Sequence, residues 1–261
     1  MGYLRKSIVL TLVLAVAFFA VSTQATVSVW GYRVVRGFYL MPFNAERVVV
    51  TLAKENAGHI EVPLIAALVD EALLILEAEL SFRPQQTIRV IVGESLNSQG
   101  VSGYYQLGIL AIAPPSPGSV DDNMRHGPML HEMTHLAVDY LAHGNYPAWL
   151  TEGIAVYLEV RYVGSTWLDL EPERTWSEIG VPDEAFSSSA WDEQAAAYWQ
   201  SYVLVSYLYE LGGRDSVILL LNDLGRGETM GNSLQRTYSI DMSDLTREAL
   251  VSFRARQEAV E

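Results

Sequence analysis

Two histidines and a glutamate on one short segment could carry metal chemistry. They lie in His131-Glu132-Met133-Thr134-His135. In a helix, positions i and i+4 lie one turn apart on the same face, so both imidazoles can reach one ion. Glu132 is rotated by about 100° from His131 around the helix axis, which places its carboxylate beside that ion, where it can hold a water molecule. Two neutral nitrogen ligands and a nearby base are what a zinc hydrolase needs.

A third ligand is available in the segment that follows. The chain has no cysteine, so any metal must be bound by His, Asp or Glu side chains. Glu152 lies in Pro147-Ala148-Trp149-Leu150-Thr151-Glu152-Gly153, in the first turns of a second predicted helix. The connection between the two helices is short, so antiparallel packing returns Glu152 to the side of His135. Taken alone, Glu152 could equally be an acidic residue favoured near a helix N-terminus.

The remaining polar residues around the motif have less specific interpretations. Flanking apolar residues indicate a largely buried helix, in which histidines and carboxylates need partners. Asp139, one turn beyond His135, either orients an imidazole or is a solvated aspartate. His126 and His143 are interpreted as loop or helix-end residues.

The elements that must position these residues follow an α+β order. The pattern predicts strands at 47–52, 87–92 and 108–113, with a helix that begins at Pro63 between the first two. Residues 95–108 are rich in Gly, Ser and Tyr and indicate a loop or an irregular hairpin. From about Pro128 the pattern is helical, with later helices at 191–211, 215–224 and 243–256. We therefore expect a small N-terminal sheet lobe and a helical C-terminal lobe, with the active-site helix between them.

The N-terminus predicts export. Arg5 and Lys6 precede an apolar run over 8–21 and the small residues of 22–25, which is the pattern of a signal peptide over residues 1–25. An uncleaved membrane anchor is the alternative, and either one places residues 26–261, a single predicted domain, outside the cytoplasm. The formal net charge of −14 argues against binding to nucleic acid through a basic surface.

The two motifs together resemble the gluzincin metallopeptidases. His131-Glu132-Met133-Thr134-His135, followed by Trp149-Leu150-Thr151-Glu152-Gly153, is similar to the peptidase MA-like family and to the catalytic domain of aminopeptidase N-type enzymes. The resemblance implies a zincin-like fold, Zn²⁺ bound by His131, His135 and Glu152, and Glu132 as the general base. It also implies a tyrosine that stabilises the tetrahedral intermediate, in the segment 197–204. Tyr198 fits that role, with Tyr202 as its substitute.

The sequence lacks one motif of the aminopeptidases, and this bears on which kind of peptidase is expected. Their Gly-x-Met-Glu-Asn motif, which binds the substrate amino terminus, has no counterpart, because Gly103-Tyr104-Tyr105-Gln106 at the matching place lacks the acid. We therefore expect a zinc metallopeptidase closer to an endopeptidase, whose peptide or protein substrate lies along an edge strand at 108–113. The alternatives are an inactive, zinc-stabilised extracytoplasmic binding module of the same fold and a structural protein without metal.

Overall fold

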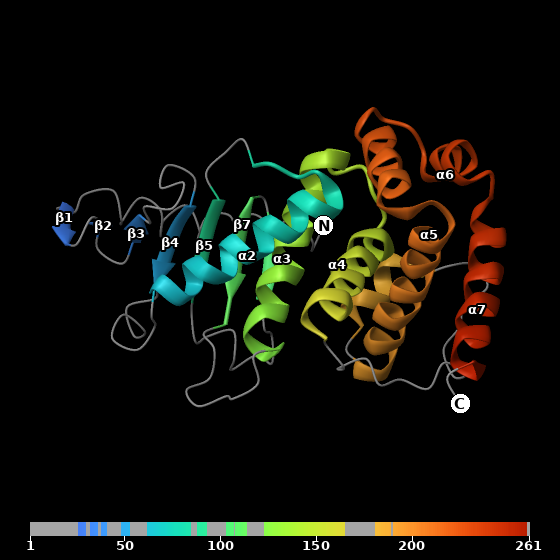
Figure 1. Ribbon diagram of the computed structural model, residues 1–261, viewed down its shortest axis with the longest axis horizontal. Coiled ribbons are helices and arrows are strands. Elements are labelled where there is room, and N and C mark those ends of the chain that lie inside the picture. Colours follow the sequence, from blue (N-terminus) through green and yellow to red (C-terminus); the bar gives the residue numbers. More distant parts are fainter. Residues whose placement is uncertain are drawn as a thin grey trace, which may run out of the picture.

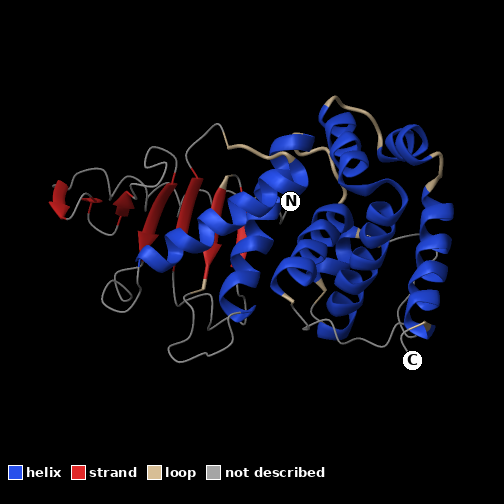
Figure 2. Ribbon diagram, in the orientation of Figure 1, coloured by secondary structure: helices blue, strands red, loops and turns tan. Residues whose placement is uncertain are grey.

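The computed structural model describes eleven ranges of the chain: 26–29, 32–35, 38–40, 48–52, 62–84, 88–92, 103–106, 108–113, 123–164, 181–188 and 190–259. The predicted signal peptide lies outside them. Strands gather at one end of the molecule and most helices at the other (Figure 2). None of the helices in these ranges combines the length and the apolar character that crossing a membrane requires. The arrangement confirms the predicted α+β class, with a sheet lobe followed by a helical lobe.

Seven strands form one mixed sheet in the order β1-β2-β3-β4-β5-β7-β6. Their bounds are β1 Thr26–Val29, β2 Tyr32–Val35, β3 Phe38–Leu40, β4 Val48–Leu52, β5 Ile88–Val92, β6 Gly103–Gln106 and β7 Ile109–Ile112. Strand β5 runs parallel to both β4 and β7, and the other pairs are antiparallel. The parallel core of the sheet therefore ends in the antiparallel hairpin β6–β7.

The prediction that 108–113 forms an edge strand is wrong. Strand β7 lies inside the sheet, because β6 pairs with it antiparallel, with Gly103 opposite Ile112 and Gln106 opposite Ile109. The edge is therefore β6, in the segment whose Gly, Ser and Tyr content suggested a loop or an irregular hairpin. Strands β6 and β7 are consecutive in the chain and form an antiparallel hairpin, so residues 103–106 adopt the hairpin, one of the two predicted alternatives for this segment.

The predicted helices appear in the predicted order, and the structure adds two that were not predicted, at 183–187 and 230–238. The helices are α2 Val62–Leu80, α3 Asn123–Ala142, α4 Ala148–Val163, the short 3-10 helix η4 Asp183–Ser187, α5 Trp191–Gly225, α6 Met230–Tyr238 and α7 Met242–Glu258. Gly213 interrupts α5 with φ 64° and ψ −173°, so α5 consists of two helical parts, as the sequence predicts. Gly164 ends α4 in the left-handed conformation, with φ 71°.

Helix α3 lies between the sheet and the helical lobe (Figure 1) and contacts α2, α4, α5, β6 and β7. Its apolar residues Met129, Leu130, Met133, Ala137 and Val138 are almost completely buried. They belong to one continuous core, which extends from α2 and the sheet to α5 and α7. Because α3 is packed on several sides, its backbone is held in place, and this fixes the positions of the polar side chains that it carries.

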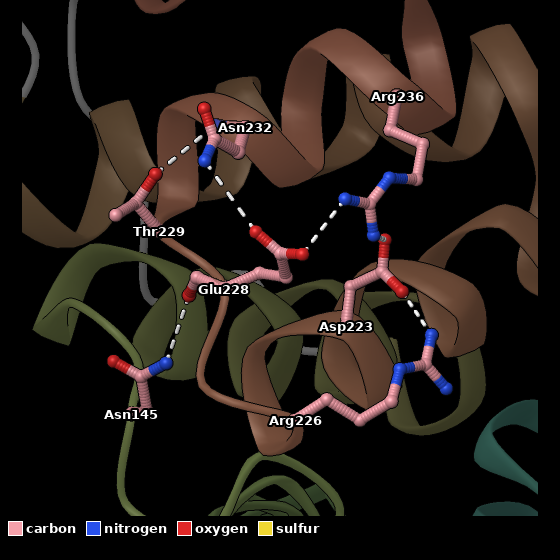
Figure 3. Close-up of polar contacts among 7 residues, drawn as sticks. All are labelled: Asn145, Asp223, Arg226, Glu228, Thr229, Asn232 and Arg236. Carbon is pink, nitrogen blue, oxygen red and sulfur yellow. Dashed lines mark hydrogen bonds and ion pairs between the residues drawn. The ribbon is translucent and has the colours of Figure 1, made fainter.

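A polar network fixes the α3–α4 connection to the end of α5 (Figure 3). The side-chain amide of Asn145 donates to the carbonyl oxygens of Leu224, at 2.7 Å, and Glu228, at 2.9 Å. Asp223, which is 1% exposed, forms ion pairs with Arg226 and with Arg236, the latter at 3.0 Å. Since this connection leads directly into α4, the network helps to set where α4 begins.

Candidate metal and catalytic site

His131, His135 and Glu152 converge on one point between α3 and α4. One ligand atom from each of the three lies within 4.8 Å of the others. Glu152 Oε2 is 3.2 Å from His131 Nε2 and 3.4 Å from His135 Nε2. Two imidazole nitrogens and one carboxylate oxygen form the donor set of an open zinc site, which leaves a coordination position for water or substrate. The residues present therefore fit a divalent metal ion.

A tight turn after α3 brings Glu152 back to the histidines. His143 and Gly144 both have positive φ, 51° and 75°, and the backbone N–H of Asn145 donates to the carbonyl of Ala142 at 3.0 Å. His143 Nδ1 also lies 3.0 Å from the carbonyl oxygen of Gly225, so His143 is a helix-end residue, as predicted. The short connection returns the chain alongside α3, as the spacing indicated.

Helix α4 comes unusually close to α5 immediately after Glu152. A Cβ atom added to Gly153 would lie 2.4 Å from the carbonyl oxygen of Ser201 and 2.6 Å from Val205 Cγ2. Only a residue without a side chain fits this crossing. Gly153 therefore lets α4 pack on α5 at the level of the candidate metal ligand.

Two residues that the sequence analysis did not identify contact the far sides of the imidazoles. Glu159 Oε2 lies 3.2 Å from His131 Nδ1, and Thr151 Oγ1 lies 2.7 Å from His135 Nδ1. Such contacts fix the orientation and tautomer of a metal-binding histidine. Glu159 follows Glu152 by seven residues, which is two helical turns on the same face, so this spacing in a buried helix was a usable signal.

Asp139 has neither of the two predicted roles. Its carboxylate accepts hydrogen bonds from the phenol of Tyr105, at 2.7 Å, and from that of Tyr146, at 3.4 Å. It therefore neither orients an imidazole nor stands alone in solvent. Both partners come from other elements, β6 and the α3–α4 connection, which a pattern read along one helix does not reveal.

The buried ionisable residues of the site shift one another's pKa values. Burial alone would raise the pKa of Glu152, but His135 and His131 hold it well below its usual range. Burial likewise opposes the charged form of His131, yet the hydrogen bonds that its ring donates to Glu152 and Glu159 raise its pKa well above the usual value. Burial also raises the pKa of Glu132, against the lowering effect of the two histidines. Glu132 is thus a more basic carboxylate than one in water.

Glu132 faces a cavity of about 270 Å³. It is 6% exposed, and a Cβ atom added to Gly103 of β6 would lie 2.7 Å from its Cγ. The edge strand thus passes directly over this carboxylate. The described residues that line the cavity include the three candidate metal ligands and a group of tyrosines: Gly103, Tyr104, Tyr105, His131, Glu132, His135, Tyr146, Thr151, Glu152 and Tyr198.

Tyr198 lines this cavity from α5, and Tyr202 does not. The ring of Tyr198 lies 6.4 Å from that of His131, and Phe186 of η4 packs edge-on against it at 5.3 Å. Burial, and then the carboxylates of Glu152 and Glu132, raise the pKa of Tyr198, so its phenol keeps its proton at neutral pH. Tyr202, one turn further along α5, lines a separate cavity with Tyr157 and other residues.

A match to a protein-family model agrees with these features. Residues 79–253 match the family model described as the Peptidase MA superfamily. Among solved structures, the chain is similar to a mutant two-domain M1 zinc metallopeptidase bound to the amino acid L-tryptophan, at 13% identity and a TM-score of 0.44. That match covers 87% of this chain and 50% of the other, so the chain spans about half the length of that structure. No curated protein matches the sequence.

Proposed function

This chain belongs to the Peptidase MA superfamily, and from that premise we propose that it is a zinc-dependent metallopeptidase that hydrolyses peptide bonds. The observation that carries the proposal is the convergence of His131, His135 and Glu152 within 4.8 Å, with Glu132 beside them in the same cavity. Structural zinc sites usually have four protein ligands, whereas three ligands next to a carboxylate base are typical of a hydrolytic site.

His131, His135 and Glu152 would hold the metal ion. A bound zinc ion would lower the pKa of a water molecule and polarise the scissile carbonyl. Glu159 and Thr151 keep each imidazole turned so that its Nε2 atom faces Glu152. This orientation is therefore set by contacts within the protein.

Glu132 is the proposed general base. Burial raises its pKa, which strengthens the carboxylate as a proton acceptor. In this mechanism it takes the proton of the attacking water and passes it to the departing amine nitrogen. Its place under the backbone of Gly103 puts that proton transfer next to the edge strand.

Tyr198 is the proposed donor to the oxyanion. Its phenol is protonated at neutral pH and lies in the same cavity as Glu132. The phenols of Tyr105 and Tyr146 also line the cavity and donate to Asp139. A protonated phenol at Tyr198, beside His131 and in the cavity of Glu132, can donate to the charge that develops on the carbonyl oxygen.

The edge strand β6 is the proposed binding surface for the substrate backbone. Among the described strands it pairs only with β7, so an extended peptide can add to its outer side. None of the described cavity residues is a lysine or an arginine that would bind a terminal carboxylate. The acids among them, Glu132 and Glu152, already have roles as base and ligand. These features favour cleavage of internal bonds over removal of a terminal residue.

A Glu132→Gln variant tests the proposal. We expect it to retain about one zinc per chain and to lose peptide hydrolysis by roughly 10²-fold or more. Elemental analysis and cleavage of a quenched fluorescent peptide library measure the two quantities. Glu248→Gln, on α7, is the matched control and should behave as wild type.

Two results would reject this mechanism. If Glu132→Gln kept the turnover of the wild type, Glu132 would not be the general base. If the purified wild-type protein contained no metal, His131, His135 and Glu152 would not form a metal site. Zinc binding without any chelator-sensitive cleavage would favour the alternative, an inactive zinc-stabilised binding module.

We also propose that the protein acts outside the cytoplasm. The support is the charged, apolar and then small pattern of residues 1–25. N-terminal sequencing of the natively expressed protein checks this. Cleavage after Ala25 indicates a signal peptide, a retained N-terminus in a membrane fraction indicates an anchor, and a retained N-terminus in the cytosol contradicts export.

A further inference from the structure

Asp139 connects two walls of the catalytic cavity. It lies one turn beyond His135 on α3 and accepts hydrogen bonds from Tyr105, on β6, at 2.7 Å and from Tyr146, in the α3–α4 connection, at 3.4 Å. Both tyrosines line the cavity. One carboxylate thus joins the helix, the edge strand and the α3–α4 connection.

The spacing of these contacts places β6 along α3 at two points. Gly103 and Tyr105 are two residues apart in β6 and so point to the same side of the sheet. Glu132 and Asp139 are seven residues apart in α3 and so lie on the same helix face. Gly103 lies against Glu132, and Tyr105 bonds to Asp139. The contact of Gly103 with Glu132 is packing alone, whereas the contact of Tyr105 with Asp139 is a hydrogen bond. Because a hydrogen bond has a preferred direction, Asp139 is the residue of α3 that fixes the position of β6.

We propose that Asp139 is a positioning residue for the substrate, which holds the edge strand β6 in register beside Glu132 through Tyr105. The inference rests on the proposed function, because it takes β6 as the strand to which the peptide backbone adds. An edge strand is paired with a neighbouring strand on one side only, so contacts outside the sheet help to set its position. Without the Asp139 anchor, β6 keeps its bonds to β7 but loses its fixed position over the base.

Asp139→Asn and Tyr105→Phe test this inference from the two ends of one hydrogen bond. In each variant we expect KM for an extended peptide to rise about tenfold, the effect of losing a hydrogen bond to a charged group. We expect kcat and bound zinc to stay at wild-type values, because the ligands and the base are unaltered. Both variants weaken the same Tyr105–Asp139 hydrogen bond, so their effects on KM should be less than additive in the double variant. Tyr140→Phe, a neighbouring and partly exposed tyrosine of α3 that packs on Phe82, is the control.

Hydrogen–deuterium exchange of residues 103–106 provides a readout that does not depend on catalysis. We expect faster exchange there in Asp139→Asn and Tyr105→Phe than in wild type and Tyr140→Phe. Unchanged exchange would overturn the inference whether or not the protein is a peptidase. Loss of zinc or of kcat in Asp139→Asn, without a change in KM, would also overturn it, because Asp139 would then support the metal site. Absence of turnover in the wild type would count against the proposed function alone.

Discussion

Replacing Gly153 with alanine tests whether the close crossing of α4 and α5 sets the geometry of the metal ligands. Gly153 follows Glu152 directly, and its added Cβ would lie 2.4 Å from the carbonyl oxygen of Ser201. Ordinary contact begins at 3.4 Å, so the two helices would have to separate by about 1 Å at this point. The obstructing atom belongs to the backbone of α5, which cannot move away as a flexible side chain can.

The expected magnitude follows from two opposing effects. Overpacking of a close-packed site costs about 1–3 kcal/mol, whereas alanine gains about 1 kcal/mol over glycine in a helix interior. We expect a net loss of up to about 2 kcal/mol in the free energy of unfolding, which lowers Tm by up to a few degrees. Because Glu152 moves together with Gly153, zinc affinity should fall by about tenfold, in the range seen when the supports of metal ligands are disturbed.

Thermal unfolding of the metal-free protein and competition titration with a zinc chelator measure the two effects. Gly231→Ala, in α6, is the matched control, because a Cβ atom there would meet nothing within 4 Å. This control should match or slightly exceed the wild type in Tm. If Gly153→Ala matched the control in both Tm and zinc affinity, the close crossing would have no part in holding Glu152, and the reasoning would be refuted.

Three further substitutions probe separate parts of the molecule. Glu159→Gln removes the carboxylate beside His131 Nδ1 and should weaken zinc binding about tenfold or more. The same chelator competition measures this, and an unchanged affinity would contradict the orienting role. Tyr198→Phe should lower kcat by about 10²-fold with little change in KM, measured by peptide cleavage, and equal kcat would remove it from the mechanism. Asp223→Asn should lower unfolding free energy by about 2 kcal/mol, because the buried carboxylate pairs with Arg226 and Arg236; denaturant unfolding without a shift of midpoint would show that these pairs contribute nothing.

Some of this site could be predicted because its geometry is local. The i, i+4 spacing of His131 and His135 fixes two ligands through helix periodicity alone, and a short connection returns Glu152 to them. The structure brings all three together within 4.8 Å. Local rules were sufficient here because α3 and α4 are consecutive and antiparallel.

Other features depend on contacts between distant segments and could not be predicted. The β6–β7 hairpin is local, but its position over Glu132 joins β6 to α3, which lies further along the chain. Asp139 lies on the predicted helix face, but its partners Tyr105 and Tyr146 come from elsewhere. Glu159 lies between these cases, since its spacing from Glu152 is regular but its contact with His131 requires the packing of two helices.

The sequence separation of the metal ligands has a consequence for how the protein folds. His131 and Glu152 are 21 residues apart, so closing this loop costs about 1 kcal/mol less conformational entropy than bringing Tyr198 to His131. Low contact order favours early formation of the α3–α4 hairpin, and a metal ion that binds folded ligands stabilises whatever structure presents them. We therefore expect zinc that is present during refolding to increase the rate at which the native protein is recovered. Zinc added after refolding should bind to the α3–α4 hairpin without changing that rate.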